Sequence, residues 1–366
     1  MPVKRHPDYT IIAITVILLA IGIVMIFSSS AVIAAEKFGD PYYFLKRQAL
    51  WAMIGLGGMF AAMRIDYRIL ARYSYVIYAA TALLLVAVLV PGVGISINGA
   101  RRWISLGVVS FQPSEFAKLG LVIFFSALLA KKEAEGKLGD FLFGYAPNLA
   151  ALGVVFFLIQ LQPDLGTAFV IGVVAFYLFT VGGIKASHLA GTAFFMTPIL
   201  WAAVYSVDYR WRRIISFLDP WGDFQDSGYQ IIQSFVALSR GGLWGVGLGA
   251  GRQKLFYLPE PHTDFIFSII GEELGLIGAA TVVALFAALT WRGFRAGLRA
   301  PDRFGSLLAL GITFAIAFQA IINISVATGI APTKGLPLPF ISLGGSALVM
   351  WLVSIGLLAN VSEHAA

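Results

Sequence analysis

The sequence predicts an all-α polytopic membrane protein with ten transmembrane helices, and three observations support this fold class. Apolar residues make up 59% of the 366 residues, charged residues make up 12%, and the mean hydropathy is +0.84. A soluble domain has about 45–50% apolar and about 25% charged residues, so a soluble core could not bury this surplus. Apolar segments of spanning length, about 20 residues, recur along the chain. We expect a single transmembrane domain over residues 1–366.

The first apolar segment, residues 10–28, follows Lys4 and Arg5 and could be mistaken for a signal peptide. The uncharged stretch from Tyr9 to Ala35 is much longer than a signal-peptide core of about 7–15 residues, so we expect a retained helix. Nine further spans are predicted at residues 47–63, 73–91, 113–130, 146–162, 164–183, 187–206, 264–290, 304–328 and 340–360.

The distribution of basic residues predicts the orientation. An even number of spans places both termini on one side of the membrane. Lys4 and Arg5 precede the first span, and the short loop at 292–303 carries four arginines. Because short cytoplasmic loops are enriched in Lys and Arg, we expect both termini in the cytoplasm. The longest loop, about 207–263, lies between predicted helices 7 and 8 and is then extracytoplasmic.

This long loop has predicted structure of its own. Residues 209–218 place three arginines among apolar and aromatic side chains, which suits a helix at a membrane interface. A second helix is expected from Ser227 to Arg240, ending at two glycines. The glycine-rich stretch at 245–251 lacks the preceding strand and the spacing of a nucleotide-binding loop. We interpret it as a turn that brings the backbone close to another segment.

Four predicted helices begin with proline and polar residues on the outer side. These helix starts are FQPSE at 111–115, LQPDL at 161–165, LPEPHTD at 258–264 and KGLPLPF at 334–340. A structural explanation exists, because proline and acids suit the first helical turn, and Glu115 and Lys118 have the spacing of an ion pair. Since all four starts share one face, we also expect an outward-facing pocket. Its predicted lining is Arg102, Lys118, Glu115, Asp164 and Asp264.

Such a pocket would combine two kinds of chemistry. Arg and Lys suit phosphate oxygens, while carboxylates suit proton abstraction or a divalent cation held with phosphates. Burial and the nearby Glu260 would raise the pKa of Asp264, whereas a helix N-terminus would lower it, and the sequence leaves this open. Glu272 and Glu273 lie farther along the same predicted helix, where we favour structural pairing over direct catalysis.

Several classes of site are excluded or disfavoured. The chain has no cysteine, so disulfides and thiolate metal sites are excluded, and its four histidines show no metal-ligand spacing. The net charge of +7 is more consistent with anionic lipid than with nucleic acid in a membrane protein. We expect no nucleic-acid partner.

Several motifs together resemble the SEDS family of peptidoglycan glycosyltransferases, whose members include FtsW and RodA. The matching stretches are GARRWI at 99–104, FQPSEFAK at 111–118, QPDLGT at 162–167, GYQIIQS at 228–234, QKLFYLPE at 253–260, HTDFIF at 262–267, GEELG at 271–275 and KGLPLPFIS at 334–342. Residues 253–257 and 333–337 are more similar to FtsW, the division member, than to RodA, the elongation member.

The resemblance implies an enzyme of the bacterial cytoplasmic membrane that polymerises lipid II into β-1,4 glycan strands on the outer face, for cell division or cell shape. It implies that Asp264 is the essential catalytic carboxylate, which deprotonates the acceptor sugar hydroxyl, and that Arg102 and Lys118 hold pyrophosphate, with Mg²⁺ or Mn²⁺ as candidate cofactors and Asp264 as a candidate metal ligand. Further substrate-binding residues expected from the motifs are Glu115, Asp164, Gln233, Ser234, Glu260, His262 and Lys334.

The same family implies protein partners, namely a class B penicillin-binding protein that crosslinks the new strand, and other divisome or elongasome membrane proteins. Two alternatives remain at this point. Ten helices with acids inside the membrane also fit a lipid II flippase or another transporter. A scaffold that only recruits the transpeptidase would not need Asp264.

Overall fold

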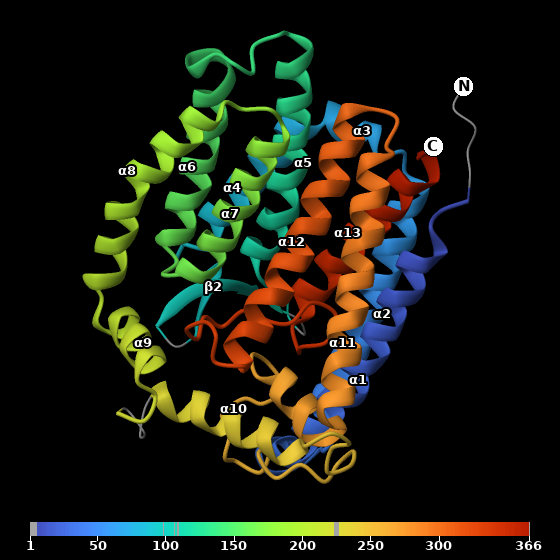
Figure 1. Cartoon of the computed structure of the whole chain (residues 1–366), viewed down its shortest axis with the longest axis vertical. Helices are drawn as coiled ribbons and strands as arrows, with labels where there is room; N and C mark the ends of the chain where they lie inside the picture. Colours follow the sequence, from blue (N-terminus) through green and yellow to red (C-terminus); the bar gives the residue numbers. More distant parts are fainter. Residues whose placement is uncertain (1–5, 98, 106, 108–109, 223–226, 366) are drawn as a thin grey trace.

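The computed structural model describes residues 6–97, 99–105, 107, 110–222 and 227–365, which fold mainly into helices (Figure 1). The α-helices are α1 (Tyr9–Phe38), α2 (Tyr43–Arg64), α3 (Arg68–Arg72), α4 (Ser74–Ala87), α5 (Pro113–Ala134), α6 (Ala146–Gln160), α7 (Leu165–Val181), α8 (Ala186–Tyr205), α9 (Asp208–Leu218), α10 (Ser227–Gly241), α11 (Ile266–Leu298), α12 (Arg303–Ala327) and α13 (Gly345–His364). A π-helical turn, η1 (Phe141–Tyr145), leads into α6.

The helices confirm a multi-pass membrane fold. Within the described residues, seven helices are long and apolar enough to cross a membrane: α1, η1 with α6, and α5, α8, α11, α12 and α13. The helices α4 and α7 are apolar but shorter. Each of the ten apolar segments predicted from the sequence overlaps a helix, and the expected helices at 209–218 and 227–240 correspond to α9 and α10.

The prediction of an all-α fold is wrong between α4 and α5. This connection forms a three-stranded antiparallel sheet of β1 (Gly94–Ile97), β2 (Ala100–Ser105) and β3 (Ser110–Phe111), in the order β1-β2-β3. The strands have only four, six and two residues, too short for an alternating pattern to stand out in the sequence. Cross-strand pairs such as Ile95 with Trp103 hold the hairpin together.

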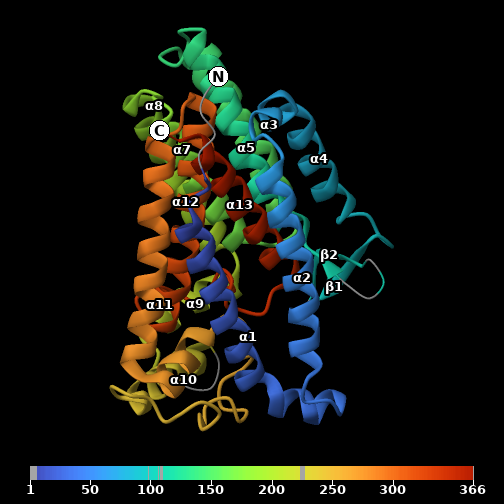
Figure 2. The same ribbon diagram turned by 90° about the vertical axis from the view of Figure 1, so that its right-hand side faces the viewer.

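The two ends of the bundle differ (Figures 1 and 2). At one end α1 begins and α13 finishes, where the main-chain N–H of Asp8 donates to Ser362 Oγ over 3.0 Å. Arg292 Nε also donates to Asp8 Oδ2 over 2.7 Å, which ties the start of α1 to α11. The sheet, α9 and α10 lie toward the opposite end. Chain segments that carry the predicted site therefore gather away from the termini.

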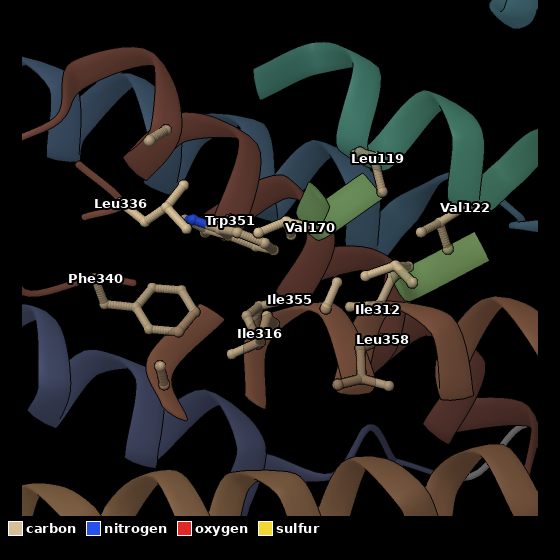
Figure 3. Close-up of a cluster of buried hydrophobic side chains, with 14 of the residues drawn as sticks. Leu119, Val122, Val170, Ile312, Ile316, Leu336, Phe340, Trp351, Ile355 and Leu358 are labelled. Carbon is tan, nitrogen blue, oxygen red and sulfur yellow. The ribbon is translucent and has the colours of Figure 1, made fainter. Parts of the chain in front are cut away.

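The core lies between α5, α7, α12 and α13, whose apolar side chains interdigitate in Figure 3. Leu336 and Phe340 come from the segment before α13, yet they reach into the same cluster beside Trp351. By contrast, α8 has no buried residue and stands at the rim of the bundle. The segment 334–344 is thus a part of the packed interior, whereas α8 exposes its apolar surface.

The glycine-rich stretch at 245–251 packs against a kink in α11. The main-chain N–H groups of Val246 and Gly247 donate to the carbonyls of Glu272 and Glu273 over 3.0 Å each. Gly275 has φ 68° and ψ −168°, and a Cβ atom there would lie 2.3 Å from the nitrogen of Gly245. Only glycine fits this conformation and this approach. The close backbone approach predicted for 245–251 is confirmed.

The predicted start of the last membrane span is too early in the chain. We expected a helix from residue 340, but α13 starts at Gly345. Phe340 instead has φ 66°, a left-handed conformation that is rare for a bulky residue, and its side chain is buried. Tertiary hydrogen bonds from Ser342 and Leu343 hold the segment out of the helix.

Candidate active site

A cavity of about 290 Å³ opens among α7, α8, α9 and the segments that precede α7 and α13. Its walls combine apolar side chains, including Phe169, Leu200 and Val204, with several charged groups. The charged residues in the lining are Arg102, Asp164, Arg210, Arg213 and Lys334. Four cations facing one carboxylate make this a site suited to an anionic group with an apolar attachment.

The cations are held in place by different elements. Arg102, on β2, donates from Nε to the carbonyl of Gln162 over 2.9 Å and from Nη2 to the carbonyl of Pro163. Arg213, on α9, donates to the carbonyl of Thr333 over 3.1 Å. The ammonium group of Lys334 lies 3.7 Å from the centre of the Phe169 ring, and burial lowers its pKa. A partly buried cation that lies over an aromatic ring and makes no hydrogen bond to another described residue favours an incoming anion.

Asp164 lines the cavity but caps a helix. Its Oδ1 accepts the main-chain N–H of Thr167 over 3.1 Å, and its Oδ2 accepts the Thr167 hydroxyl over 2.8 Å. These bonds satisfy donors at the start of α7, which is the usual task of an N-cap aspartate. The prediction that Asp164 lies in the pocket is correct. Its hydrogen bonds, however, are those of a helix cap, as the structural interpretation of the proline-containing helix starts expects.

Asp264 adjoins the cavity directly before α11. A Cβ atom on Gly335, which follows Lys334, would lie 3.5 Å from Asp264 Oδ2. Among the described residues the carboxylate accepts no hydrogen bond, whereas the main-chain carbonyl of Asp264 accepts one from Asn323 Nδ2 over 2.8 Å. The backbone is fixed while the carboxylate oxygens remain available to a substrate.

The environment raises the pKa of Asp264 to about 6. Burial is the largest cause, the negative charge of Glu260 adds to it, and the positive charge of Arg213 opposes both. The sequence left open whether this pKa would be raised or lowered, and in the structure the raising effects of burial and Glu260 outweigh the lowering effect of Arg213. A carboxyl group with a pKa near the operating pH is suited to accept and release a proton.

The two polar neighbours of Asp264 in its motif differ in environment. Glu260 is exposed and has φ 45°, and its carbonyl accepts the Thr263 hydroxyl over 2.9 Å. His262 is buried against Phe44, with ring centres 4.6 Å apart. Burial, with the charge of Lys37, lowers the His262 pKa to about 4, so this ring is neutral at pH 7. Glu260 acts on Asp264 through charge, and His262 packs beneath the loop.

Glu115 and Lys118 are not brought to the cavity. They form a buried ion pair of 2.7 Å on α5, and Lys118 Nζ donates to Gln319 Oε1 over 2.8 Å. The same ammonium group lies 4.9 Å from the centre of the Trp351 ring. The pairing anticipated from their spacing is confirmed. Contact of these two residues with substrate stays a prediction that this structure does not support.

Two further predicted substrate-binding residues lie on α10. Ser234 is buried and its hydroxyl donates to the carbonyl of Ala327, with Ser268 Oγ also 2.5 Å away, so it joins α10 to α12 and α11. Gln233 is partly buried and is not in the cavity lining. The structure thus brings Arg102, Asp164 and Lys334 together beside Asp264, and leaves Gln233 and Ser234 outside.

Arg210 and Arg213 were missed as site residues. The sequence indicated an interfacial helix at 209–218 but not which face would turn toward the pocket. In the structure Arg213 lies over the Tyr209 ring, 4.3 Å from its centre, and Arg210 donates to the carbonyl of Ala203 over 2.8 Å. The clustering of three arginines in eleven residues was the signal that could have found them.

Glu272 and Glu273 are structural, as the sequence favoured. Glu273 Oε1 lies 2.6 Å from Lys254 Nζ, and Glu272 Oε1 accepts the main-chain N–H of Arg252 over 2.9 Å. Both carboxylates fasten the loop between α10 and α11. The described residues include no group of three or more His, Cys, Asp or Glu side chains that could hold a metal ion.

Known proteins match this chain over nearly its whole length. The family model of FtsW, RodA and SpoVE, described as cell cycle proteins, matches residues 9–366. A probable peptidoglycan glycosyltransferase FtsW from Geobacter sulfurreducens is 45% identical over 362 residues, which cover 99% of this chain and 96% of the relative. Stage V sporulation protein E of Bacillus subtilis is 45% identical over 361 residues, which cover 99% of this chain and 98% of the relative.

Solved structures agree with these relatives. A chain from a study of how a peptidoglycan synthase complex coordinates polymerization and crosslinking has a TM-score of 0.78 and 32% identity, covering 97% of each chain. The rod shape determining protein RodA of Thermus thermophilus has a TM-score of 0.72 and 30% identity, covering 97% of this chain and 96% of that one. With matches over nearly the whole chain in both sequence and structure, the protein belongs to the FtsW, RodA and SpoVE family of cell cycle proteins.

Proposed function

We propose that the protein is a peptidoglycan glycosyltransferase that polymerises lipid II into β-1,4 glycan strands. The observation that carries the proposal is the Asp264 carboxyl, with its raised pKa, beside a cavity that combines four cations with apolar walls. The name of the Geobacter sulfurreducens relative, a probable peptidoglycan glycosyltransferase, supports the same reaction.

In the proposed reaction Asp264 is the general base. Its carboxylate takes the proton from the 4-hydroxyl of the acceptor sugar as that oxygen attacks the anomeric carbon of the donor. The bond from this carbon to the phosphate oxygen breaks, and undecaprenyl pyrophosphate leaves with the electron pair. One displacement inverts the α-linked donor to a β-1,4 bond. A base with a pKa of about 6 is ionised at neutral pH and can still be protonated during the step.

The cavity suits the pyrophosphate of the donor lipid. Arg102, Arg213 and Lys334 line the cavity and would donate hydrogen bonds to the pyrophosphate oxygens. Hydrogen bonds from a cationic side chain to phosphate are strong where little water competes. Leu200 and Val204 line the same cavity from α8, the helix with no buried residue. An isoprenoid tail could therefore leave the cavity along α8 into the bilayer while the headgroup stays beside Asp264.

A divalent cation fits this site only together with substrate. Mg²⁺ is commonly bound through one or two carboxylates and substrate phosphates rather than by a full protein cage. Asp264 would be the protein ligand for Mg²⁺ or Mn²⁺, and the bound ion would neutralise charge on the leaving pyrophosphate. The Asp264 carboxylate fits because its oxygens have no hydrogen-bond partner among the described residues.

We also propose that ten helices span the cytoplasmic membrane of a bacterium, with both termini in the cytoplasm. The start of α1 and the end of α13 meet at one end of the bundle, and the cavity residues lie toward the other. Four arginines, on the last turns of α11, in the short connection after it and at the start of α12, are at the same end as the termini, which agrees with the positive-inside rule. The loop of about 207–263 would then be extracytoplasmic.

The proposed partner is a class B penicillin-binding protein that crosslinks the new strands. The similar chain from a peptidoglycan synthase complex supports a joint machine for polymerization and crosslinking. Further membrane proteins of the divisome or elongasome are expected around it. The relatives named FtsW favour a role in division over a role in cell elongation.

The proposal is tested with purified protein, fluorescent lipid II and a class B transpeptidase, with and without Mn²⁺. We expect glycan polymer on gels, with longer incubation giving longer strands. The same preparation in vesicles, given lipid II in the inner leaflet alone, should not move it outward. Transbilayer movement of lipid II without any polymer would instead establish the flippase, and neither activity despite partner binding would indicate a scaffold.

A further inference from the structure

Three consecutive main-chain carbonyls lead up to α11, and each has its own donor from a distant part of the chain. The carbonyl of His262 accepts the main-chain N–H of Leu343 over 2.9 Å. The Thr263 carbonyl accepts the Ser342 hydroxyl over 2.6 Å, and the Asp264 carbonyl accepts Asn323 Nδ2 over 2.8 Å. These carbonyls precede the first residue of α11, so no intrahelical partner fixes them.

Asn323 bonds both segments that meet at the site. Its Nδ2 donates to the carbonyl of Asp264 and also to the carbonyl of Leu336, over 2.8 Å in each case. The side chain is only 1% exposed, on a mainly apolar stretch of α12. A buried amide is costly, and Asn323 Oδ1 has no hydrogen-bond partner among the described residues, so the two bonds that Nδ2 donates are what this side chain contributes there.

The segment that supplies the other donors is itself rigidly held. Leu336 and Phe340 are inserted in the core (Figure 3), and the carbonyl of Pro337 accepts Gln319 Nε2 over 2.8 Å. Ser342 Oγ accepts the main-chain N–H of Leu338 over 2.8 Å while donating to Thr263. Through Gln319 this framework continues to the buried ammonium group of Lys118.

All of these bonds reach the backbone and none reaches the Asp264 carboxylate. A donor on the carboxylate would stabilise its ionised form and occupy an oxygen that the reaction needs. Donors on the three carbonyls instead fix where the side chain begins and leave its oxygens free. Placing the bonds on the backbone therefore combines a precise position with an available base.

We infer that Asn323 and Ser342 are positioning residues that aim the Asp264 carboxylate at the acceptor hydroxyl. This inference rests on the proposed role of Asp264 as the general base. A displacement of about 1 Å at a reacting group can reduce a rate about 100-fold, so loss of either donor should act on kcat. Substrate affinity should change little, because neither side chain lines the cavity.

The test compares Asn323→Leu, Asn323→Asp and Ser342→Ala with the wild-type chain in lipid II polymerisation. The aspartate variant keeps the shape of the side chain but loses the amide donor. We expect kcat to fall about 10–100-fold in the Asn323 variants, with KM within about twofold. Ser342→Thr, which keeps the hydroxyl, should recover most of the activity lost in Ser342→Ala.

The matched control is Asn360→Leu. Asn360 is also buried, and it also makes two hydrogen bonds to main-chain groups, accepting from Tyr67 over 3.1 Å and donating to Met63 over 2.7 Å. It lies near the termini, away from Asp264. We expect this variant to lose stability without losing kcat per folded molecule. An equal fall of kcat in Asn360→Leu and Asn323→Leu would overturn the inference.

A second measurement does not depend on catalysis. The chain has no cysteine, so Asp264→Cys places a single thiol at the site. Its rate of alkylation by N-ethylmaleimide should change several-fold when Asn323→Leu or Ser342→Ala is added, and not with Asn360→Leu. If Asn323→Leu does not fold, Ser342→Ala, which removes only a hydroxyl, provides the same comparison.

The outcomes separate this inference from the proposed function. Unchanged alkylation rates, or kcat within twofold of wild type in the donor variants, would contradict the positioning role. Absence of polymer from the wild-type chain, together with a changed alkylation rate, would contradict the proposed function alone. It would leave Asn323 and Ser342 as the residues that position Asp264.

Discussion

The ammonium group of Lys254 lies 2.6 Å from Glu273 Oε1, so a buried ion pair joins the loop after α10 to the first part of α11. Glu273 Oε2 also accepts the Ser28 hydroxyl from α1 over 2.6 Å and the main-chain N–H of Gly249 over 3.1 Å. Because these partners come from α1 and from the loop after α10, the carboxylate ties both segments to the first part of α11, the helix that follows Asp264.

Removing one member of this pair should be strongly destabilising. Lys254→Met leaves the Glu273 charge buried without its counterion, which costs about 3–5 kcal/mol. The double variant Lys254→Met/Glu273→Gln should be more stable than Lys254→Met alone, because it removes the uncompensated charge. Unfolding followed by fluorescence of the eight tryptophans gives both values. Lys46→Met, which breaks the exposed pair with Asp40, is the control and should change stability little.

The rate of polymerisation should depend on ionisation of Asp264. Its pKa is raised to about 6, and the base works when it has lost its proton. The rate should therefore be constant above pH 7 and fall about tenfold per pH unit below pH 6. An initial-rate profile at saturating lipid II measures the midpoint. A midpoint near pH 4 would mean that the carboxyl is not desolvated during the reaction.

Two single substitutions should move that midpoint in opposite directions. The negative charge of Glu260 raises the Asp264 pKa, so Glu260→Gln should shift the midpoint to lower pH. The positive charge of Arg213 lowers it, so Arg213→Gln should shift the midpoint to higher pH. Shifts of the same sign in both variants would show that the titrating group is not Asp264. His262→Gln should leave the midpoint in place, because the His262 ring is already neutral there.

Asp264→Asn should make the folded protein more stable at neutral pH. The folded pKa of Asp264 lies above its ordinary unfolded value of about 3.9, so its contribution to stability is full below about pH 4 and is lost as pH rises through 6. The melting temperature of the variant should exceed that of the wild type at pH 7.5, and the difference should vanish near pH 4. A destabilised variant at pH 7.5 would contradict the assigned environment.

Lys334→Met should weaken binding of the lipid substrate. The Lys334 ammonium group faces the cavity beside Phe169 and has no hydrogen bond to another described residue, so its charge is available for pyrophosphate. We expect KM for lipid II to rise about tenfold, which corresponds to about 1.4 kcal/mol. Arg240→Gln, which removes an exposed cation outside the cavity, is the control for a general effect of charge. Equal changes in both variants would exclude a specific contact.

The apolar segments were predictable because lipid requires long runs without charge, and every predicted run overlaps a helix. The ends of the helices were less predictable where hydrogen bonds to distant parts of the chain compete with helical hydrogen bonds. Residues 340–344 are apolar enough to continue α13, yet Ser342 and Leu343 bond to the carbonyls of Thr263 and His262 instead. Such competition depends on a segment about 80 positions away, which local patterns do not contain.

The candidate site was predicted in part. Arg102 and Asp264 were predicted in an outward-facing pocket and Lys334 was predicted from a motif that resembles a known family, and the structure places all three at or beside one cavity. Glu115 and Lys118 are also an acidic and a basic residue, but they form an ion pair with each other three positions apart on α5. Residue type alone could therefore not show whether they line the pocket or lie in the core. The buried amide of Asn323 was overlooked, although a polar residue inside an apolar helix is itself a signal of function.

The central claim is that Asp264 removes the proton from the acceptor sugar, and the most direct test is polymerisation of lipid II by wild type and Asp264→Asn at equal folded concentration. Both should bind lipid II and the transpeptidase partner alike, since the substitution preserves the shape of the side chain. We expect polymer from the wild type and at least a thousandfold lower rate from the variant, about 4 kcal/mol of lost transition-state stabilisation. Polymer formed by Asp264→Asn at a rate near that of the wild type would contradict the account.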